Sequence, residues 1–454
     1  MKLDSLQVTN FRCFESLTVK FDSQLTVLVA NNGKGKTAIL ESIVLGLGVF
    51  MSAIPVRKIV GKPFEDTDFR VYDNGDKPAY MRIFLETKEG MRWDKTEPRD
   101  KVTKTLRSIP QDVGKKEISD YARSAYEKWM EAENQFPLIA YYGTGRAVFT
   151  TPQRRRNFRK ELVGEARLID AYKDSLSANT NFRNFFEDFY ILEDEERRSQ
   201  KDRRDWDYQG FELVIIRNAI SRMMPGFSNP RTKTRPLRFM IDWEHESRKQ
   251  SLRLDQLSDG FRTSLAMIMD IALRLALLHS KAEAASPNVD AVLNAEGIVL
   301  IDEIDLHLHP SWQQTILPDL MRTFPGIQFI VTTHSPQVLT TVRRENIRVI
   351  GPNILNQIIA EPPQAMTYCQ PSGDVMQSVM RVDPQPPGQD GEKADLERLT
   401  ELVDQGCHDK DEARKLQRRL VIKLGEQHPQ LQRLERSIKR QERIKNEEHK
   451  KRLQ

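Results

Sequence analysis

The feature that most constrains the fold is a run of apolar residues leading directly into two acids. Residues 297–301 (Gly-Ile-Val-Leu-Ile) precede Asp302 and Glu303. An unbroken apolar run of this length predicts a parallel strand that is buried on both faces. Ligands bind an open α/β sheet at the carboxyl ends of such strands. The sequence therefore predicts an α/β fold whose binding edge carries these two carboxylates.

A phosphate-binding loop is predicted far upstream. Residues 25–29 read as a strand and residues 38–47 as a helix; residues 30–37 (Ala-Asn-Asn-Gly-Lys-Gly-Lys-Thr) fit G-x-x-x-x-G-K-[ST], except that Ala30 replaces the first glycine. Glycines let successive N–H groups point at phosphates, and Ala30 is tolerated if its φ stays negative. A glycine turn with a chance lysine is the simpler alternative. We instead predict nucleotide contacts from Asn31, Asn32, Gly33, Lys34, Gly35, Lys36 and Thr37.

The two acids and a histidine are expected to complete a hydrolysis site. Asp302 is placed to hold Mg²⁺ together with the Thr37 hydroxyl, and Glu303 is placed to polarise the attacking water. Residues 327–332 form a further apolar strand, and His334 follows it, within reach of a γ-phosphate or that water. Solvated acids and a structural histidine are the alternatives. We predict Glu303 and His334 as catalytic residues and Mg²⁺ as a cofactor.

A fourth motif begins a helix predicted within residues 252–279. Residues 257–262 read Leu-Ser-Asp-Gly-Phe-Arg, in which Ser258 is a good N-cap and Gly260 allows close backbone approach. Alone, this segment is only a helix start. Together with the other three motifs it resembles the signature motif of ABC-type ATPases. That resemblance implies that Ser258, Asp259 and Gly260 complete the nucleotide site of a partner subunit, so that nucleotide joins two protomers.

Composition predicts a soluble protein of two or three domains. The 454 residues carry a net charge of +5, and residues 431–454 alone hold nine Lys or Arg against four Glu, so the rest is nearly neutral. Cys13, Cys369 and Cys407 have no C-x-x-C spacing, which fits a reducing cytoplasm. No signal peptide is evident, and the longest uncharged run, residues 42–56, is too short to span a bilayer. We expect a cytoplasmic protein without a membrane partner.

Four regions are expected along the chain. The nucleotide-binding head comprises residues 1–150, with the phosphate loop, and residues 246–351, with the signature, the acids and the histidine. Residues 151–245 are predicted to be a helical insert without the sustained heptads of a long coiled coil. Residues 352–454 contain several prolines and end in a basic helix, which predicts a C-terminal interaction region. Its apolar set suits a docking helix rather than an independent core: Leu431, Leu434, Ile438 and Ile444.

Together these motifs resemble the ABC ATPase superfamily, in the branch of RecF-, SMC- and OLD-like ATPases. The run of residues 302–313 and the Thr-Thr-His-Ser-Pro segment at 332–336 are its most specific matches. Residues 10–14 (Asn-Phe-Arg-Cys-Phe) are similar to the opening motif of that branch, which implies a contribution of Arg12 to ATP binding. The resemblance implies a mostly parallel P-loop sheet with flanking helices and an antiparallel N-terminal subdomain.

This chain looks similar to the PtuA-type ATPases of Septu anti-phage systems, which also occur in some retrons. The similarity lies in its size, its basic tail and residues 141–146 (Tyr-Tyr-Gly-Thr-Gly-Arg). This implies an ATPase, regulatory and slow in turnover, that forms a homodimer or larger oligomer and works with a separate PtuB-like HNH nuclease. A nuclease within this chain is not expected, because only about 100 residues follow the histidine strand. Two residues depart from the family pattern: Ala30 in the phosphate loop, and Asp259 where most signatures have glycine. Both departures put the rate of ATP hydrolysis in doubt more than ATP binding.

A second function competes with this one, namely a RecF-like repair ATPase that binds DNA itself. The nearly neutral body argues against a large DNA channel. The basic tail and residues 154–156 (Arg-Arg-Arg) can nevertheless contact DNA or RNA phosphates. A solvated charged face is the simpler interpretation of both segments. The neighbouring gene would discriminate best, since an adjacent HNH nuclease favours the defence function.

Overall fold

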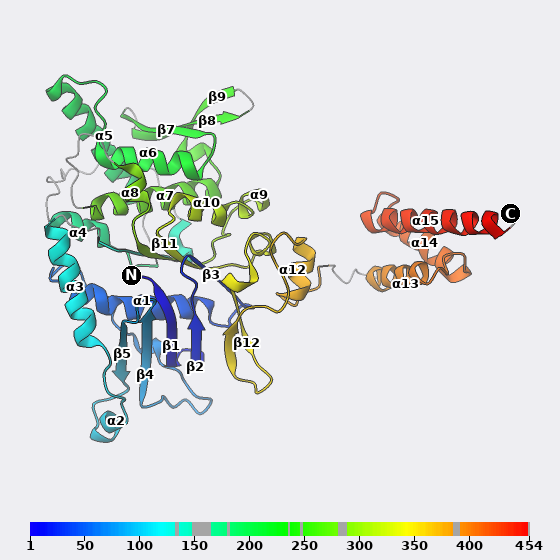
Figure 1. Cartoon of the computed structure of the whole chain (residues 1–454), viewed down its shortest axis with the longest axis horizontal. Helices are drawn as coiled ribbons and strands as arrows, with labels where there is room; N and C mark the ends of the chain where they lie inside the picture. Colours follow the sequence, from blue (N-terminus) through cyan, green and yellow to red (C-terminus); the bar gives the residue numbers. More distant parts are fainter. Residues whose placement is uncertain are drawn as a thin grey trace. The chain divides into compact units, whose positions relative to one another are not determined.

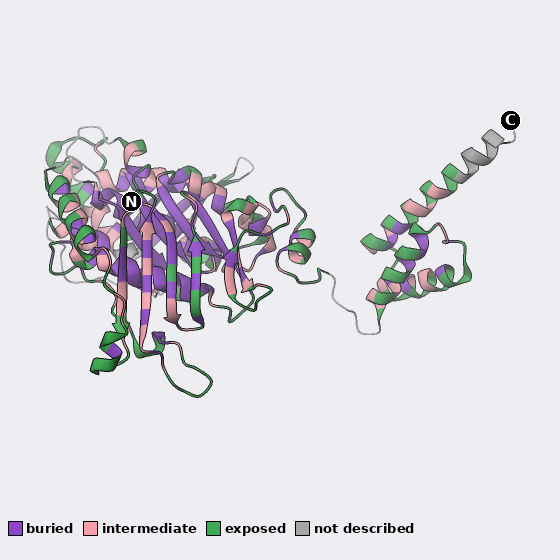
Figure 2. Cartoon of the chain, turned by 60° about the horizontal axis from the view of Figure 1, so that its bottom comes forward, coloured by how far each residue is buried: buried purple, intermediate pink, exposed green. Residues whose placement is uncertain are grey.

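The computed structural model describes residues 1–131, 136–147, 165–178, 182–234, 237–245, 248–279, 288–384 and 391–452. The chain divides into two units, Met1–Met380 and Arg381–Gln454. Each unit has its own cluster of buried apolar side chains, large in the first and small in the second. Figure 2 shows that the buried residues of the first unit concentrate in its sheets and in the helices packed on them.

A six-stranded sheet forms the centre of the first unit, with the strand order β13-β12-β3-β11-β10-β6. All neighbouring strands are parallel except β12 and β13. Four strands are buried along their whole length, as expected for unbroken apolar runs. The predicted mostly parallel α/β sheet is therefore confirmed. Its strands are β3 (Leu25–Val29), β6 (Leu138–Tyr142), β10 (Gly297–Ile301), β11 (Ile327–Thr332), β12 (Ile347–Pro352) and β13 (Ile358–Glu361).

Two long apolar helices cover this sheet (Figure 1). α1 (Lys36–Ala53) contacts β11 and the N-terminal strands, whereas α7 (Asp259–Leu278) contacts β6 and the helices around it. By length and composition α1 could cross a membrane, but 72% of it is buried inside the protein. The smaller helices of this unit are α2 (Thr103–Arg107), α8 (Val289–Leu293), α9 (Pro310–Gln313), α10 (Ile316–Thr323), α11 (Pro336–Leu339) and α12 (Ser372–Ser378).

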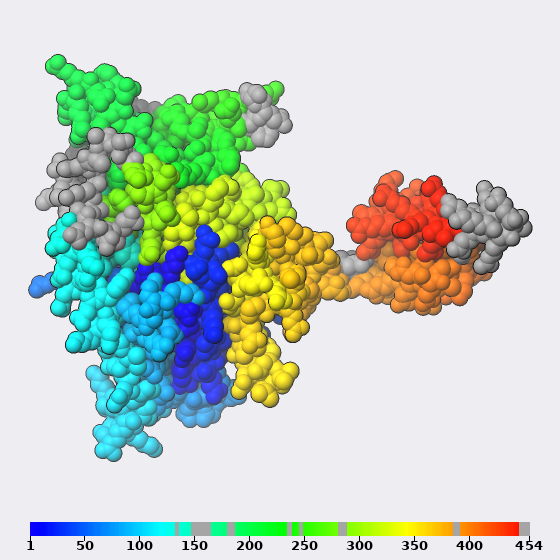
Figure 3. Space-filling view, viewed as in Figure 1, coloured from blue at the N-terminus to red at the C-terminus, as the bar shows by residue number. Residues whose placement is uncertain are grey.

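An antiparallel N-terminal sheet packs on the other side of α1. Its order is β2-β1-β4-β5, and it confirms the expected antiparallel subdomain. The indole N–H of Trp93 donates to the carbonyl of Gly46 in α1 at 2.8 Å. Figure 3 shows the blue N-terminal strands beside the yellow segment that contains β13, which contacts β2. The elements are β1 (Leu3–Phe11), β2 (Phe14–Lys20), β4 (Tyr80–Thr87), β5 (Arg92–Pro98) and the covering helix α3 (Lys115–Met130).

The predicted helical insert is helical only in part. It contains α4 (Glu165–Tyr172), α5 (Phe182–Arg203), α6 (Phe211–Met223) and then a three-stranded antiparallel sheet of β7 (Phe227–Thr234), β8 (Leu237–His245) and β9 (Arg248–Arg253). The prediction of helix up to residue 245 is therefore wrong from residue 227. The rings of Phe186 and Phe189 lie 5.0 and 5.3 Å from that of Phe239, so strand β8 is held by contacts with α5. The many charged residues in this part of the sequence made these strands difficult to recognise.

The described residues of the second unit form three helices, α13 (Glu392–Asp404), α14 (Asp411–Leu424) and α15 (Pro429–Arg452). It begins later than the predicted boundary at residue 352, because the segment up to Met380 packs in the first unit through side chains such as Val375. The expectation that this region has no core of its own is also wrong. Apolar residues of all three helices form a small one: Leu396, Leu399, Leu402, Val403, Ala413, Leu420, Leu431 and Leu434.

Candidate functional site

The strand order brings the phosphate loop and the two acids to one edge of the central sheet. β11 lies between β3, which precedes the loop, and β10, which precedes the acids. The hydroxyl of Thr37 donates to Oδ2 of Asp302 at 2.8 Å, although these residues are 265 positions apart. The two residues predicted to share Mg²⁺ are therefore direct neighbours.

Two glycines shape the phosphate loop. Gly33 has φ 73° and Gly35 has φ 88°, in the left-handed region that side chains disfavour. A Cβ on Gly35 would also lie 2.3 Å from the ring of Phe14 and 2.7 Å from Sγ of Cys13. The N-terminal motif at residues 10–14 thus packs directly beneath the loop. Ala30 does not have positive φ, so the expected condition for replacing glycine there is met. The segment from Asn31 to Lys34 is exposed.

The loop lysine is held by the loop itself. Nζ of Lys36 donates to the carbonyls of Ala30 at 2.8 Å and Asn31 at 3.4 Å, and the residue is 7% exposed. Burial lowers the pKa of Lys36, although the charges of Asp302 and Glu303 act in the opposite direction. The cation is thus positioned in a partly desolvated loop, where a phosphate oxygen would compete with these carbonyls.

Asp302 is buried and fixed through both of its oxygens. Oδ2 accepts the hydroxyl of Thr37, and Oδ1 accepts the hydroxyl of Thr332 at 2.6 Å. The same Thr332 oxygen accepts the backbone N–H of Glu303 at 2.7 Å. A carboxylate beside a threonine hydroxyl is a pair of hard oxygen donors, which fits Mg²⁺. The sequence alone indicates no role for Thr332, because only its place in the sheet brings it to Asp302.

A buried arginine holds the backbone of residues 302–303, which follow β10 and are called the acidic turn below. Glu303 has φ 49°, which is uncommon for a residue other than glycine. The guanidinium of Arg146 donates to the carbonyl oxygens of Asp302, of Glu303 at 2.6 Å and of Gly143 at 2.9 Å. Arg146 is 3% exposed, and burial lowers its pKa against the attraction of the nearby acids. The resemblance covered residues 141–146 without assigning this role to Arg146.

The predicted catalytic histidine follows β11 at the same edge of the sheet. His334 is half-buried, and its backbone N–H donates to Oδ1 of Asp305 at 3.3 Å. The hydroxyl of Thr333 donates to the same oxygen at 2.6 Å. Asp305 therefore fixes the segment that carries His334, a role not expected from its sequence position. The catalytic roles of His334 and Glu303 themselves stay predictions.

The signature segment begins α7 as expected. Ser258 is its N-cap, and the Ser258 hydroxyl accepts the N–H of Phe261 at 3.5 Å. A Cβ on Gly260 would lie 2.3 Å from the carbonyl oxygen of His307, so the close approach requires glycine there. Ser258 and Asp259 are exposed, which leaves them accessible to a second protomer.

Two further predictions concern Arg12 and the basic residues 154–156. The guanidinium of Arg12 forms ion pairs with Glu41 and, at 2.8 Å, with Asp68. Its proposed contribution to ATP binding is untested, although the neighbouring residues Cys13 and Phe14 lie against the phosphate loop. The basic residues 154–156, predicted to contact nucleic acid, lie outside the described residues.

Comparison with known proteins identifies the family. A family model described as an AAA domain matches residues 5–222. The probable ATPase of retron Ec83 from Escherichia coli is 32% identical over 76% of this chain and 71% of its own length. The probable ATPase of retron Vc95 from Vibrio cholerae is 26% identical over 77% and 74%. Septu protein PtuA from Bacillus mycoides is 26% identical over 74% of this chain but 38% of its own length. The chain therefore belongs to the family of ABC-like ATPases that includes these retron ATPases, to which PtuA is related.

Proposed function

We propose that this ATPase binds ATP with Mg²⁺ at the carboxyl edge of the central sheet and hydrolyses it between two copies of the chain. The contact of 2.8 Å between the Thr37 hydroxyl and Asp302 carries the proposal, because it joins the phosphate loop to the acidic turn. Lys36 supplies positive charge to the β- and γ-phosphates, while Thr37 and Asp302 hold the metal. Bound Mg²⁺ supplies charge neutralisation at those phosphates.

Hydrolysis would depend on Glu303 and His334. The carboxylate of Glu303 takes a proton from the attacking water, and His334 donates a hydrogen bond to the γ-phosphate. Support comes from the turn that carries Glu303, since Arg146 and Thr332 hold its backbone. A general base acts efficiently only when its position is fixed, and these contacts supply that fixation.

The second copy would complete the site through its signature segment. Ser258 and Asp259 are exposed at the start of α7, where helix N–H groups and the helix dipole favour an anion. In the dimer this helix start faces the γ-phosphate bound by the other protomer. ATP then stabilises the dimer by mass action, since it binds the paired form best.

The binding site is tested with Lys36→Ala. Loss of the cation is expected to abolish ATP binding in a nucleotide titration, whereas Lys128→Ala, which removes an exposed lysine of α3 outside the loop, retains it. Dimerisation is tested with Ser258→Arg, whose lost N-cap costs about 1 kcal/mol and leaves the fold intact. ATP-dependent dimers, measured by light scattering, should disappear in this variant. Unchanged binding in Lys36→Ala, or unchanged dimers in Ser258→Arg, contradicts the corresponding half of the proposal.

We further propose that this cytoplasmic ATPase restrains and scaffolds an HNH nuclease in anti-phage defence, with the nuclease docked on the C-terminal unit. The family relationship supports the defence role, and the separate core of Arg381–Gln454 supports a docking module. Deletion of residues 381–454 should leave ATP binding intact and abolish co-purification with a co-expressed PtuB-like nuclease. Co-purification at full yield would instead favour the region around α5 and α6 as the docking element.

A further inference from the structure

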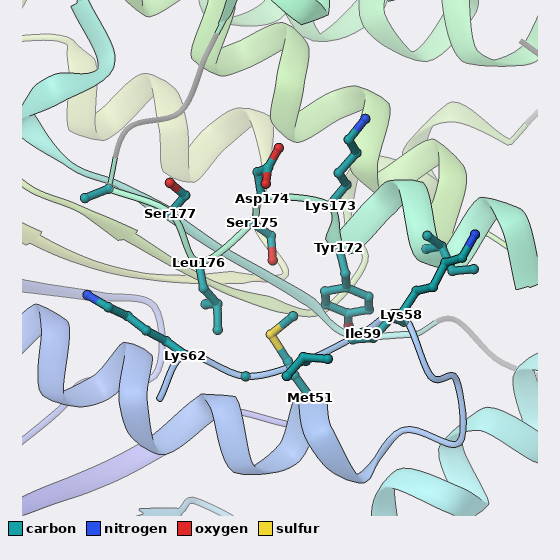
Figure 4. A pocket seen from close by; sticks show the side chains of 14 residues that line it. Met51, Lys58, Ile59, Lys62, Tyr172, Lys173, Asp174, Ser175, Leu176 and Ser177 are labelled. Carbon is teal, nitrogen blue, oxygen red and sulfur yellow. The ribbon is translucent and has the colours of Figure 1, made fainter. Parts of the chain in front are cut away.

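A cavity of about 550 Å³ lies beside the C-terminal end of α1, the end opposite the phosphate loop. One wall comes from residues 51–62 and the other from residues 169–178 (Figure 4). Met51, Ile59 and Leu176 give the cavity an apolar lining. This volume is in the range of small-molecule sites, which typically span about 300–1,000 Å³. No residue of the hydrolysis site lines it.

Positive charge surrounds this cavity. Lys58, Lys62 and Lys173 are among its lining residues, against one acid, Asp174. In Figure 4 the lysines come from three sides of the cavity, with Lys58 and Lys62 on either side of Met51. Nζ of a further, half-buried lysine, Lys95, donates to the carbonyl of Lys62 at 2.5 Å and so anchors that wall. The excess of cations favours an anionic ligand.

Ser175, which lines the cavity, carries a buried hydroxyl. Ser175 is 2% exposed, and its Oγ has no hydrogen-bond partner among the described residues. Figure 4 shows this hydroxyl pointing toward the side of Met51. Its backbone is fixed, because its carbonyl accepts the N–H of Tyr141 in β6 at 2.7 Å. A buried hydroxyl without a hydrogen-bond partner is energetically unfavourable. A ligand that accepts a hydrogen bond from this hydroxyl would remove that cost.

Both walls press on elements of the ATPase site. A Cβ on Gly61 would lie 2.1 Å from the carbonyl oxygen of Gly48, so this wall crosses α1 in direct backbone contact. A Cβ on Gly143 would lie 2.6 Å from the carbonyl oxygen of Ala178 in the other wall. The carbonyl of Gly143 also accepts Arg146, which holds the acidic turn. A ligand that moves the first wall would thus shift α1, the helix that follows the phosphate loop. A ligand that moves the second wall would shift the acidic turn.

We propose that this cavity binds a small phosphorylated molecule with an apolar ring, of mononucleotide size, and that its occupancy changes the rate of ATP hydrolysis. The positive charge of Lys58, Lys62 and Lys173 attracts the phosphate, the hydroxyl of Ser175 donates to it, and the apolar side chains of the lining contact the ring. The binding claim stands by itself. The effect on hydrolysis rests on the proposed function.

Binding is tested with a fluorescent AMP derivative and the full chain carrying Lys36→Ala, so that the phosphate loop does not contribute. Adding Lys58→Glu and Lys62→Glu should weaken AMP binding about tenfold or more, because two favourable charges become unfavourable. A matched pair of exposed lysines near α2, changed by Lys101→Glu and Lys104→Glu, should have no effect. Absence of AMP binding, or equal weakening by the two pairs, overturns the proposal.

Ser175→Ala provides a second test. It should weaken AMP binding by about tenfold, as expected for a lost hydrogen bond to a charged group, without lowering the melting temperature of the free protein. A lower melting temperature with unchanged affinity would show that the hydroxyl serves the fold and overturn its assigned role. Inorganic phosphate is expected to compete weakly. Competition equal to that of AMP would overturn the assignment of a ring to the apolar lining.

The coupling is measured separately in the protein with an intact phosphate loop. AMP should change the rate of phosphate release from ATP at least twofold, and Lys58→Glu with Lys62→Glu should remove this response while leaving the basal rate. An equal response in both proteins overturns the coupling. If Lys36→Ala still binds ATP while AMP binding depends on Lys58 and Lys62, the ATP-site proposal fails and the cavity proposal stands.

Discussion

The carboxyl edge of the central sheet and the C-terminal unit position their residues in opposite ways. At the sheet edge, hydroxyls and carboxylates meet from segments far apart in sequence, as Thr37 and Asp302 do across 265 positions. In the C-terminal unit, the buried apolar residues that the structure describes all lie between Leu396 and Leu434. The first arrangement depends on a large core and a fixed strand order. The second depends on three neighbouring helices.

This difference implies different sensitivities to mutation. The first unit buries residues from strands and helices between Met1 and Met380, so we expect its fold to tolerate the loss of one contact better than its chemistry does. Among its described residues the second unit buries eight apolar side chains, and small cores have little stability to spare. We expect substitutions at the sheet edge to change ATP turnover and comparable substitutions in the C-terminal unit to change folding.

The largest expected effect is on turnover in Glu303→Gln. This change keeps the shape of the side chain and removes the base, so phosphate release should fall about 10²- to 10⁴-fold. ATP affinity in a titration should stay unchanged, since the phosphate contacts remain. Glu442→Gln, in α15 of the C-terminal unit, is the matched control and should hydrolyse ATP normally. Unchanged hydrolysis in Glu303→Gln would move the base elsewhere, with His334 as the first alternative.

Arg146→Ala should have the next largest effect. It leaves the carbonyls of Asp302 and Glu303 without their buried donor, so the acidic turn is expected to shift and turnover to fall about 10²-fold. The free energy of unfolding of the first unit should also fall by about 2 kcal/mol. Arg398→Ala removes an exposed arginine of the C-terminal unit and should leave turnover unaffected. Full activity in Arg146→Ala would show that the turn holds its shape unaided.

A pair of leucine truncations tests the difference in stability directly. Leu320→Ala in the first unit and Leu399→Ala in the second each remove a buried side chain, at a cost of about 2–5 kcal/mol. Leu399→Ala is expected to unfold α13–α15, seen as rapid hydrogen exchange and proteolysis of residues 391–452. Leu320→Ala should leave its unit folded at room temperature. Equal protection of both units in both variants would contradict the comparison.

The smallest expected effect is a pH dependence of the first unit. Burial lowers the pKa of Lys95 to about 8, from 10.5 for the free side chain. Between these values the unfolded chain binds a proton that the folded chain has released, so stability contributed by this residue rises with pH. The melting temperature relative to Lys95→Met should therefore increase from pH 8 to pH 10. A difference that is constant or falls over this range would contradict the prediction, and the C-terminal unit serves as internal control.

The fold class and the expected residues of the proposed site can be recognised in the amino-acid sequence. Buried parallel strands are recognisable because they need unbroken apolar runs, as in residues 297–301. The phosphate loop is recognisable because its conformation needs glycines such as Gly33 and Gly35, both of which have positive φ. The start of a helix can be recognised at a residue such as Ser258, because its side chain caps a backbone N–H only three residues further along the chain. These are local requirements, and a local pattern reveals them.

The residues that hold the backbone and side chains of that site become recognisable only in the folded chain. Thr332 and Arg146 act on Asp302 and Glu303 because strand order makes β6, β10 and β11 neighbours, and no local pattern encodes that order. The strands of the insert and the core of the C-terminal unit were not predicted, because they too depend on contacts between elements. A weak apolar pattern in a charged segment becomes a strand or a core helix only when another element covers it.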